Sequence, residues 1–149
     1  MKAEDSEMSR RTALIVEDNP DDERLTIRAL DRLELDVDYH VVRDGVEAVT
    51  YLRSCSELPC LVLLDVKLPL MTGHEVLEEI RSDVRLNHLP VVFFTSSDDP
   101  KDIAAAYRNR VNGYVQKPVD FDEFASRVRV LGRYWLTDNI AAIRECAAR

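Results

Sequence analysis

The sequence predicts an α/β fold in which helices cover both faces of a parallel β-sheet. Three observations predict it: five short apolar runs read as strands, the segments between them carry apolar residues at helical spacing, and the two kinds of segment alternate along the chain. Strands that are apolar throughout are typical of a sheet buried on both faces. The 149 residues are enough for one such domain, and its crossovers should be right-handed.

The first strand is expected over residues 12–16, an apolar run that ends at Glu17. The next helix should begin at Asn19, whose side chain can cap it, with Pro20 in its first turn. Acidic residues suit the positive end of the helix dipole, and here they are Asp21, Asp22 and Glu23. One apolar face of this helix consists of Leu25, Ala29, Leu30 and Leu33.

A second strand is expected over residues 37–42, and a third over residues 60–65. Pro59 before the third run and turn-forming residues at 69–73 after it favour a buried strand over a helix. The helix between these strands should start at a turn formed by Asp44 and Gly45, and it carries Val46, Val49 and Leu52. In the helix after the third strand, the side chains that should point inward are those of Val76, Leu77 and Ile80.

The C-terminal half continues the alternation, with strands over residues 90–95 and 113–117 and a weaker helix over residues 99–109 between them. Asp120 and Glu123 resemble a capping box at the start of the last helix. Its apolar residues recur at helical spacing and should serve the core, or, where the stripe outruns the sheet, present apolar area to another chain; they are Phe121, Phe124, Val128, Leu131 and Trp135. Residues 137–139 either cap a short separate helix or lie on the exposed side of a longer last helix.

The predicted domain covers residues 11–136. Residues 1–10 are charged and lack periodicity, so we expect a flexible N-terminal tail, and residues 137–149 form a helical extension too short for a separate output domain. No apolar run approaches the ~18 residues of a membrane-spanning helix, and the N-terminus does not resemble a signal peptide. We therefore expect a cytoplasmic protein without membrane contacts.

Composition excludes some classes of function. With 20 basic and 28 acidic residues the formal net charge is −8, which argues against a nucleic-acid binder. The three cysteines are an odd number, and Cys55 and Cys60 lack the spacing of a zinc site, so we expect buried or reduced thiols. The histidines are scattered, and we assign none as a metal ligand or phosphodonor.

Acidic residues follow two of the predicted strands. Glu17 and Asp18 follow the first, and Asp65 ends the third. The carboxyl ends of parallel strands meet at one edge, where ligands collect, so these three carboxylates should lie together. Their repulsion calls for a cation, and hard oxygen ligands suit Mg²⁺. The alternative for Glu17 and Asp18 is that they only provide negative charge at a helix N-terminus.

The fourth and fifth strands bring Thr95 and Lys117 to the same edge. A carboxylate nucleophile, a divalent cation, a hydroxyl and an ammonium are the groups needed to transfer a phosphoryl group. Asp65 would attack phosphorus and form an acyl phosphate. The alternatives are that Lys117 is a solvated lysine and that Thr95 only caps a turn.

Four segments together resemble the signature of response-regulator receiver domains, in their usual order. They are residues 16–19 (VEDN), 64–73 (LDVKLP through to Gly73), 94–96 (FTS) and 114–118 (YVQKP). The resemblance covers about residues 11–136. It implies a flavodoxin-like, doubly wound sheet of five parallel strands in the order 2-1-3-4-5 with five helices.

The resemblance also implies the roles of the site residues. Asp65 would accept a phosphoryl group from a histidine kinase, while Thr95 and Lys117 hold the phosphoryl oxygens. Mg²⁺ would be bound by Asp18, by Asp65 and by the backbone carbonyl of Lys67, with Glu17 acting through water. Thr95 and Tyr114 would form a switch, although Tyr114 could equally be an ordinary half-buried aromatic. The surface that runs from Asp99 to Trp135 would report the switch.

Two positions depart from the family pattern. Thr72 stands where the family often has Asp or Asn, and Lys67 places a cationic side chain beside the site. Lys67 and Ser97 lie where family members tune the lifetime of the acyl phosphate, so we expect an altered lifetime of unspecified sign. The stretch ending in Trp135 and Leu136 is similar to small regulators that pair with bacteriophytochrome histidine kinases, some of which form homodimers.

Two other functions compete with this one. A pseudo-receiver would keep the fold without phosphorylation, but three repelling carboxylates have no chemical use in such a module. An aspartate-nucleophile phosphatase generally needs Asp-x-Asp, whereas Lys67 stands at the second acidic position. No glycine-rich nucleotide-binding loop is present in the sequence. We therefore expect a signalling protein and not an enzyme.

Overall fold

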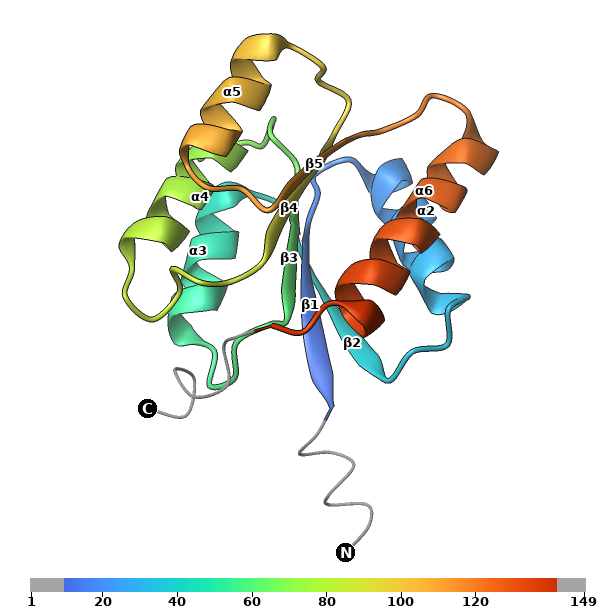
Figure 1. The fold of residues 1–149 in the computed structure, drawn as a ribbon, viewed down its shortest axis with the longest axis horizontal. Helices are drawn as coiled ribbons and strands as arrows, with labels where there is room; N and C mark the ends of the chain where they lie inside the picture. The colour runs from blue at the N-terminus through green and yellow to red at the C-terminus, as the bar shows by residue number, and fades with distance from the viewer. Residues whose placement is uncertain (1–9, 142–149) are drawn as a thin grey trace, which may run out of the picture.

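The computed structural model describes residues 10–141, which form a three-layer α/β structure (Figure 1). Its strands are β1 (Arg11–Val16), β2 (Val37–Val42), β3 (Leu61–Leu64), β4 (Val91–Thr95) and β5 (Gly113–Gln116). Its α-helices are α2 (Pro20–Asp31), α3 (Gly45–Ser54), α4 (Gly73–Ser82), α5 (Pro100–Arg108) and α6 (Phe121–Arg133). The order of elements is the predicted strict alternation.

All five strands are parallel, and their order in the sheet is β2-β1-β3-β4-β5. This is the flavodoxin-like arrangement with strand order 2-1-3-4-5, so the predicted fold class is confirmed. Each strand is joined to the next by a helix that crosses one face of the sheet. The order reverses at β1, which lies between β2 and β3, and the strand ends at β1 and β3 therefore flank the switch point of the sheet.

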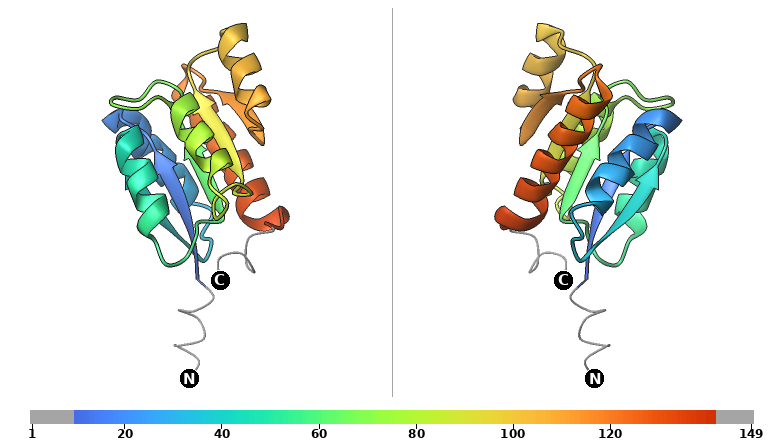
Figure 2. Two further views of the ribbon diagram at one scale, coloured as in Figure 1. Left: turned by 90° about the vertical axis from the view of Figure 1, so that its left-hand side faces the viewer. Right: turned by 90° about the vertical axis from the view of Figure 1, so that its right-hand side faces the viewer.

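Helices cover both faces of the sheet (Figure 2). One face carries α2 and α6, which pack on each other, and the other carries α3, α4 and α5. The side chains of β1 alternate between the two cores: Leu14 and Val16 pack on the α3 side, and Ala13 and Ile15 on the α2 side. Both sets are buried, which explains why the strand reads as a continuous apolar run in the sequence.

The helix starts confirm the predicted cap at Asn19 and, in part, the predicted capping box at Asp120. The Asn19 side chain accepts hydrogen bonds from the backbone N–H groups of the first turn of α2, and Asp44 caps α3. At α6 the Asp120 side chain accepts from Glu123 N, but the reciprocal bond of a full capping box is not formed. A complete capping box occurs instead at α4, between Thr72 and Glu75. Thr72, the departure noted in the sequence, therefore has a structural role.

Two apolar side chains that the spacing directed inward are exposed. Phe121 is 71% exposed, because it is the first residue of α6 and lies a full turn ahead of the buried Phe124. Val46 is 44% exposed, at the second position of α3. Both residues lie in the first turn of their helices.

The last helix continues past Arg133 in a turn of π-helix, Tyr134–Asp138, and Asn139 follows in an extended conformation. Residues 137 and 138 therefore lie in a longer last helix instead of capping a new one. The predicted N-terminal tail and C-terminal extension lie largely outside the described residues. Arg10, at the boundary, forms ion pairs with Asp36 at 2.5 Å and with Asp38 at 2.7 Å.

Cys55 is half-buried and Cys60 is buried, and both are free thiols. Burial raises the pKa of the Cys60 thiol. Within residues 10–141 no helix is both long and apolar enough to cross a membrane.

Candidate functional site

The carboxylates predicted to meet do so because sheet pairing continues past the strand ends. The Asp65 backbone N–H donates to the Val16 carbonyl at 3.2 Å, and Glu17 N–H donates to the Val42 carbonyl at 3.0 Å. Both residues are buried: the side chain of Glu17 is 5% exposed and that of Asp65 is 10% exposed. One carboxylate oxygen from each of Glu17, Asp18 and Asp65 lies within 4.8 Å of the others.

The loop after Asp65 is held in place by a close backbone approach at Gly73. The Gly73 N–H donates to the Val66 carbonyl at 2.8 Å. A Cβ atom at position 73 would lie 2.2 Å from the Asp65 carbonyl oxygen, so a side chain cannot be accommodated without a backbone shift. The start of α4 thus packs directly against the backbone that carries Asp65.

Lys117 is buried in the middle of the acidic cluster. Its backbone follows β5, with its N–H donating to the Thr95 carbonyl at 2.7 Å. Its Nζ contacts Glu17 Oε1 at 2.7 Å, Asp22 Oδ2 at 2.8 Å and Asp65 Oδ2 at 2.9 Å. The ammonium therefore joins the carboxyl ends of β1, β3 and β5 and the first turn of α2.

Burial and neighbouring charge shift the pKa values of two residues of the site, Lys117 and Glu17. Burial lowers the pKa of Lys117, but the charges of Asp65 and Glu17 outweigh burial, so the pKa is raised and the ammonium stays charged. Burial raises the pKa of Glu17 from 4.5 to about 7, although Lys117 opposes it. A single ammonium shared among three carboxylates does not compensate all of them. The site retains negative charge and fits a divalent cation bound by oxygen ligands.

Thr95 and Tyr114 lie on the other side of Asp65. Thr95 is fully buried at the end of β4, and its Oγ1 accepts from Ser97 N–H at 3.3 Å. The Tyr114 hydroxyl donates to the Ser97 carbonyl at 3.0 Å, and its half-buried ring packs edge-on against Phe93 at 5.8 Å between centroids. The two predicted switch residues are thus connected through the backbone of the β4–α5 loop.

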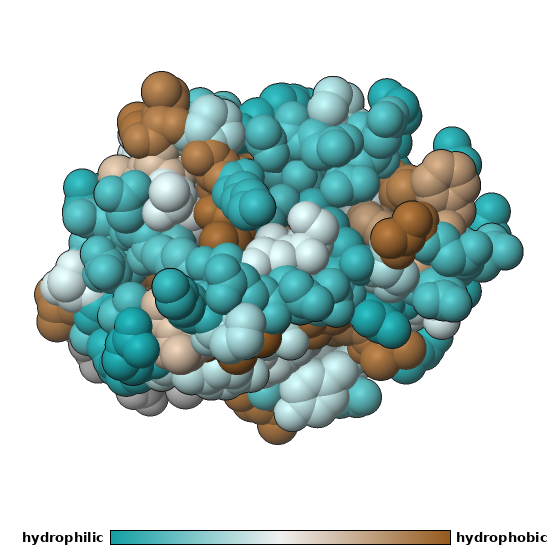
Figure 3. All heavy atoms as spheres, turned by 90° about the horizontal axis from the view of Figure 1, so that it is seen from above, coloured by the Kyte–Doolittle hydropathy of each residue, from teal (hydrophilic) through white to brown (hydrophobic). Residues whose placement is uncertain are grey.

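Lys67 lies next to the Asp65 carboxylate. Its side chain is exposed, and its backbone N–H lies 3.4 Å from Asp65 Oδ1. The residue therefore adjoins the Asp65 carboxylate as expected, and the use of its carbonyl as a metal ligand stays a prediction. Seen from above, the face of the molecule at this edge is largely hydrophilic, with separate hydrophobic groups toward its margin (Figure 3).

Sequence reasoning missed two features of the site. Asp22 was assigned only to the helix dipole, yet its carboxylate contacts Lys117 across 95 positions in the chain. The second feature is a chain of hydrogen bonds beside Thr95, in which Ser97 Oγ donates to Asp102 Oδ2 at 2.6 Å and His74 Nε2 lies 3.2 Å from Asp102 Oδ1. The bond from Ser97, together with His74, lowers the pKa of Asp102.

Comparison with known proteins supports the same interpretation. Residues 13–129 match the family described as the response regulator receiver domain. The chain is 41% identical over 127 residues to the probable methanogenesis regulatory protein FilR2 of Methanothrix harundinacea, a match that covers 83% of this chain and 82% of FilR2. It is 34% identical over 131 residues to the response regulator Rcp1 of Synechocystis, covering 85% of this chain and 89% of Rcp1.

Solved structures agree with the sequence matches. The phosphorylated cyanobacterial phytochrome response regulator RcpA superposes with a TM-score of 0.86 at 34% identity, covering 90% of this chain and 99% of RcpA. A Mn²⁺-bound form of Rcp1 gives a TM-score of 0.84 at 32% identity, covering 88% of this chain and 98% of that one. The fold, the acidic cluster and these matches agree: the chain belongs to the response regulator receiver domain family of two-component signalling.

Proposed function

We propose that the chain accepts a phosphoryl group on Asp65 from a sensor histidine kinase, with Mg²⁺ bound beside it. The observation that supports this most is the position of Lys117, whose ammonium contacts both Asp65 and Glu17 in a buried site with a cluster suited to a cation. A buried carboxylate flanked by a fixed ammonium and by oxygen ligands has the parts that phosphoryl transfer requires.

In the proposed reaction a carboxylate oxygen of Asp65 attacks phosphorus of a phosphohistidine. The bond between phosphorus and nitrogen breaks, its electron pair stays on the imidazole, and an acyl phosphate forms on Asp65. Lys117 and the Thr95 hydroxyl would hold the phosphoryl oxygens as negative charge spreads over them. Glu17, Asp18, Asp65 and the Lys67 carbonyl would hold Mg²⁺, which would neutralise charge on the transferred group.

The alternative functions are less well supported. A pseudo-receiver gains nothing from burying Glu17 and Asp65 together, since burial of two like charges costs free energy unless a cation or proton is used. A phosphatase needs a general acid near the nucleophile, and the nearby position 67 holds an exposed lysine. We therefore propose a signalling role without further enzymatic activity.

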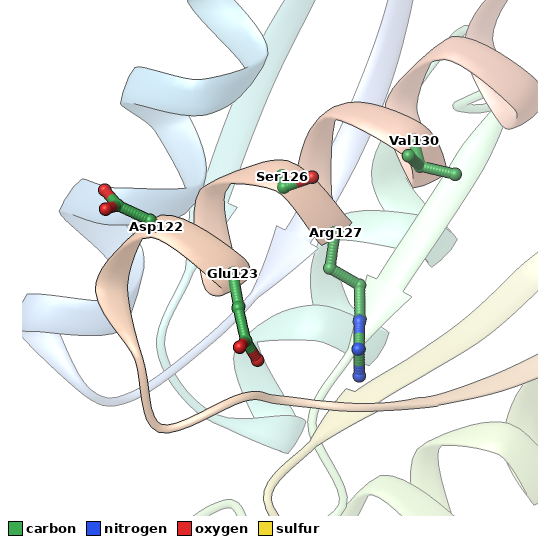
Figure 4. Close-up of a pocket in the computed structure, with 5 residues that line it drawn as sticks. All are labelled: Asp122, Glu123, Ser126, Arg127 and Val130. Atoms are coloured by element: carbon green, nitrogen blue, oxygen red, sulfur yellow. The ribbon is translucent and has the colours of Figure 1, made fainter.

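The proposed output is a change in the surface that runs from Asp99 to Trp135. Thr95 would move toward the phosphoryl group, and its loop would take Tyr114 with it through the bond to the Ser97 carbonyl. This surface already exposes large apolar side chains, namely Tyr107, Val119, Phe121, Val130 and Tyr134. A shallow pocket on α6, lined in part by Arg127 and Val130, lies within the same surface (Figure 4).

The surface is also the proposed contact of a homodimer, and its apolar side chains are the groups that an interface would cover. The relative RcpA is a phytochrome response regulator, so we propose a bacteriophytochrome-type kinase as the partner. Light scattering at micromolar concentration tests the dimer: a dimer that dissociates in Val130→Lys supports it, and a monomeric wild type contradicts it.

Incubation with a small phosphodonor such as acetyl phosphate tests the central function. We expect wild type to gain one phosphoryl group only when Mg²⁺ is present, as seen by intact-protein mass spectrometry. Asp65→Asn should gain none, whereas Asp99→Asn, which alters an exposed carboxylate outside the cluster, should behave as wild type. Equal labelling of wild type and Asp65→Asn would contradict the proposal.

A further inference from the structure

Three carboxylates surround the Lys117 ammonium, which donates hydrogen bonds to Asp22 Oδ2 and Asp65 Oδ2 and forms an ion pair with Glu17. A lysine ammonium carries three N–H donors, and each of the three carboxylates around Lys117 Nζ lies within 2.9 Å of it. A phosphoryl group on Asp65 would accept a hydrogen bond at most from the Lys117 N–H that now donates to Asp65. A further hydrogen bond from Lys117 to the phosphoryl oxygens draws on the donor that Asp22 now accepts or on the one that faces Glu17.

Asp22 is the carboxylate that can be released at lower cost. Its side chain is 25% exposed, whereas that of Glu17 is 5% exposed. Glu17 is also held by a second contact, since its Oε2 accepts from Asn19 N–H at 3.2 Å. A carboxylate that loses its ion pair near the surface can be hydrated, whereas a buried one cannot.

We propose that Asp22 is a positioning residue that holds the Lys117 ammonium in the unphosphorylated protein and competes with the phosphoryl group for it. The proposal rests on the proposed function of Asp65. Asp22 lies in the first turn of α2, where its backbone N–H donates to the Asn19 cap at 3.1 Å, so its position is fixed by the helix. Phosphorylation would then weaken the ion pair between Asp22 and Lys117, which connects the start of α2 to the end of β5.

Two causes should make removal of the Asp22 charge strengthen the binding of a phosphoryl group at Asp65. Without the Asp22 charge, Lys117 is freer to donate to a phosphoryl oxygen, and one negative charge near the phosphoryl group is removed. Asp22→Asn should therefore bind beryllium trifluoride, a phosphoryl analogue, more tightly than wild type in the presence of Mg²⁺. We expect a gain of about threefold to fivefold in affinity, the scale of a partly exposed ion pair.

Asp21→Asn is the matched control. Asp21 is the preceding residue, it undergoes the same change of charge in the same helical turn, and its exposed side chain pairs with Arg24 instead of Lys117. Both variants should keep the wild-type far-UV circular dichroism spectrum. Asp22→Glu restores the charge, so its affinity should return toward that of wild type. NMR of the lysine ammonium groups should show a shifted Lys117 ¹⁵Nζ signal in Asp22→Asn and an unshifted one in Asp21→Asn.

The outcomes separate the two proposals. Tighter beryllium trifluoride binding in Asp22→Asn than in Asp21→Asn, with a displaced Lys117 signal, supports the role of Asp22. Equal affinities in the two variants, or weaker binding in Asp22→Asn, overturns it while wild type still binds. Failure of wild type itself to bind beryllium trifluoride contradicts the proposed function of Asp65 instead.

Discussion

Glu17 should make the stability of the metal-free protein depend on pH. Its pKa is raised from 4.5 in the ordinary side chain to about 7 by burial. Between about pH 4.5 and about pH 7 the Glu17 carboxyl is therefore protonated in the folded state and ionised in the unfolded state. The contribution of Glu17 to the free energy of unfolding is fully present below about pH 4.5 and is lost as the pH rises through about 7.

The size of this effect follows from the two pKa values. At about 1.4 kcal/mol for each tenfold change in proton affinity, the difference is worth about 3 kcal/mol in the free energy of unfolding. Most of that loss should appear between about pH 5 and about pH 8. For a domain of this size it shifts the urea midpoint by about 1 to 2 M.

Urea titrations of metal-free wild type and Glu17→Gln across this pH range provide the assay, with far-UV circular dichroism as the signal. The glutamine keeps an acceptor for Lys117 but cannot titrate, so its free energy of unfolding should change much less with pH. Glu78→Gln, at an exposed position on α4, should retain the wild-type profile. Parallel profiles for wild type and Glu17→Gln would refute the reasoning.

Four further substitutions have defined outcomes. Gly73→Ala should lower the free energy of unfolding by about 2 kcal/mol or more in urea titrations, because the new Cβ meets the Asp65 carbonyl at 2.2 Å; an unchanged midpoint would contradict this. Thr72→Ala should cost about 1 kcal/mol through the lost cap and leave phosphoryl labelling unchanged. Lys67→Ala and Ser97→Ala should each change the rate of acyl-phosphate loss, measured as the decay of the phosphorylated mass, and unchanged rates in both would show that these positions do not tune the lifetime.

Much of the fold could be predicted because both faces of the sheet are covered. Burial on both sides makes the strands continuous apolar runs, as in β3 and β4, where every residue is buried. Polar residues directly after such runs must then lie at one edge of a parallel sheet. This reasoning brought Asp65 and Glu17 together with Lys117, and the structure places all three in contact.

The contacts that sequence reasoning missed depend on how helices and loops pack in three dimensions, which the spacing of apolar residues does not show. Asp22 in the first turn of α2 contacts Lys117 after β5, and the spacing of residues in the sequence does not show that these two segments adjoin. The bonds from Ser97 to Asp102 and from Asp102 to His74 join a loop and two helices that are separate in sequence. Phe121 was placed in the core by spacing alone, which does not say where a helix ceases to touch the sheet.

Chemical mapping of the modified residue tests the central claim most directly, because four carboxylates lie in the site, three around Lys117 and Asp18 beside them in the acidic cluster. Borohydride reduction of the acyl phosphate converts the phosphorylated aspartate to homoserine, which peptide mass spectrometry can locate. After treatment with acetyl phosphate and Mg²⁺, we expect homoserine at position 65 alone. Homoserine at position 18 or 22, or at no position, would contradict the assignment of Asp65 as the phosphoryl acceptor.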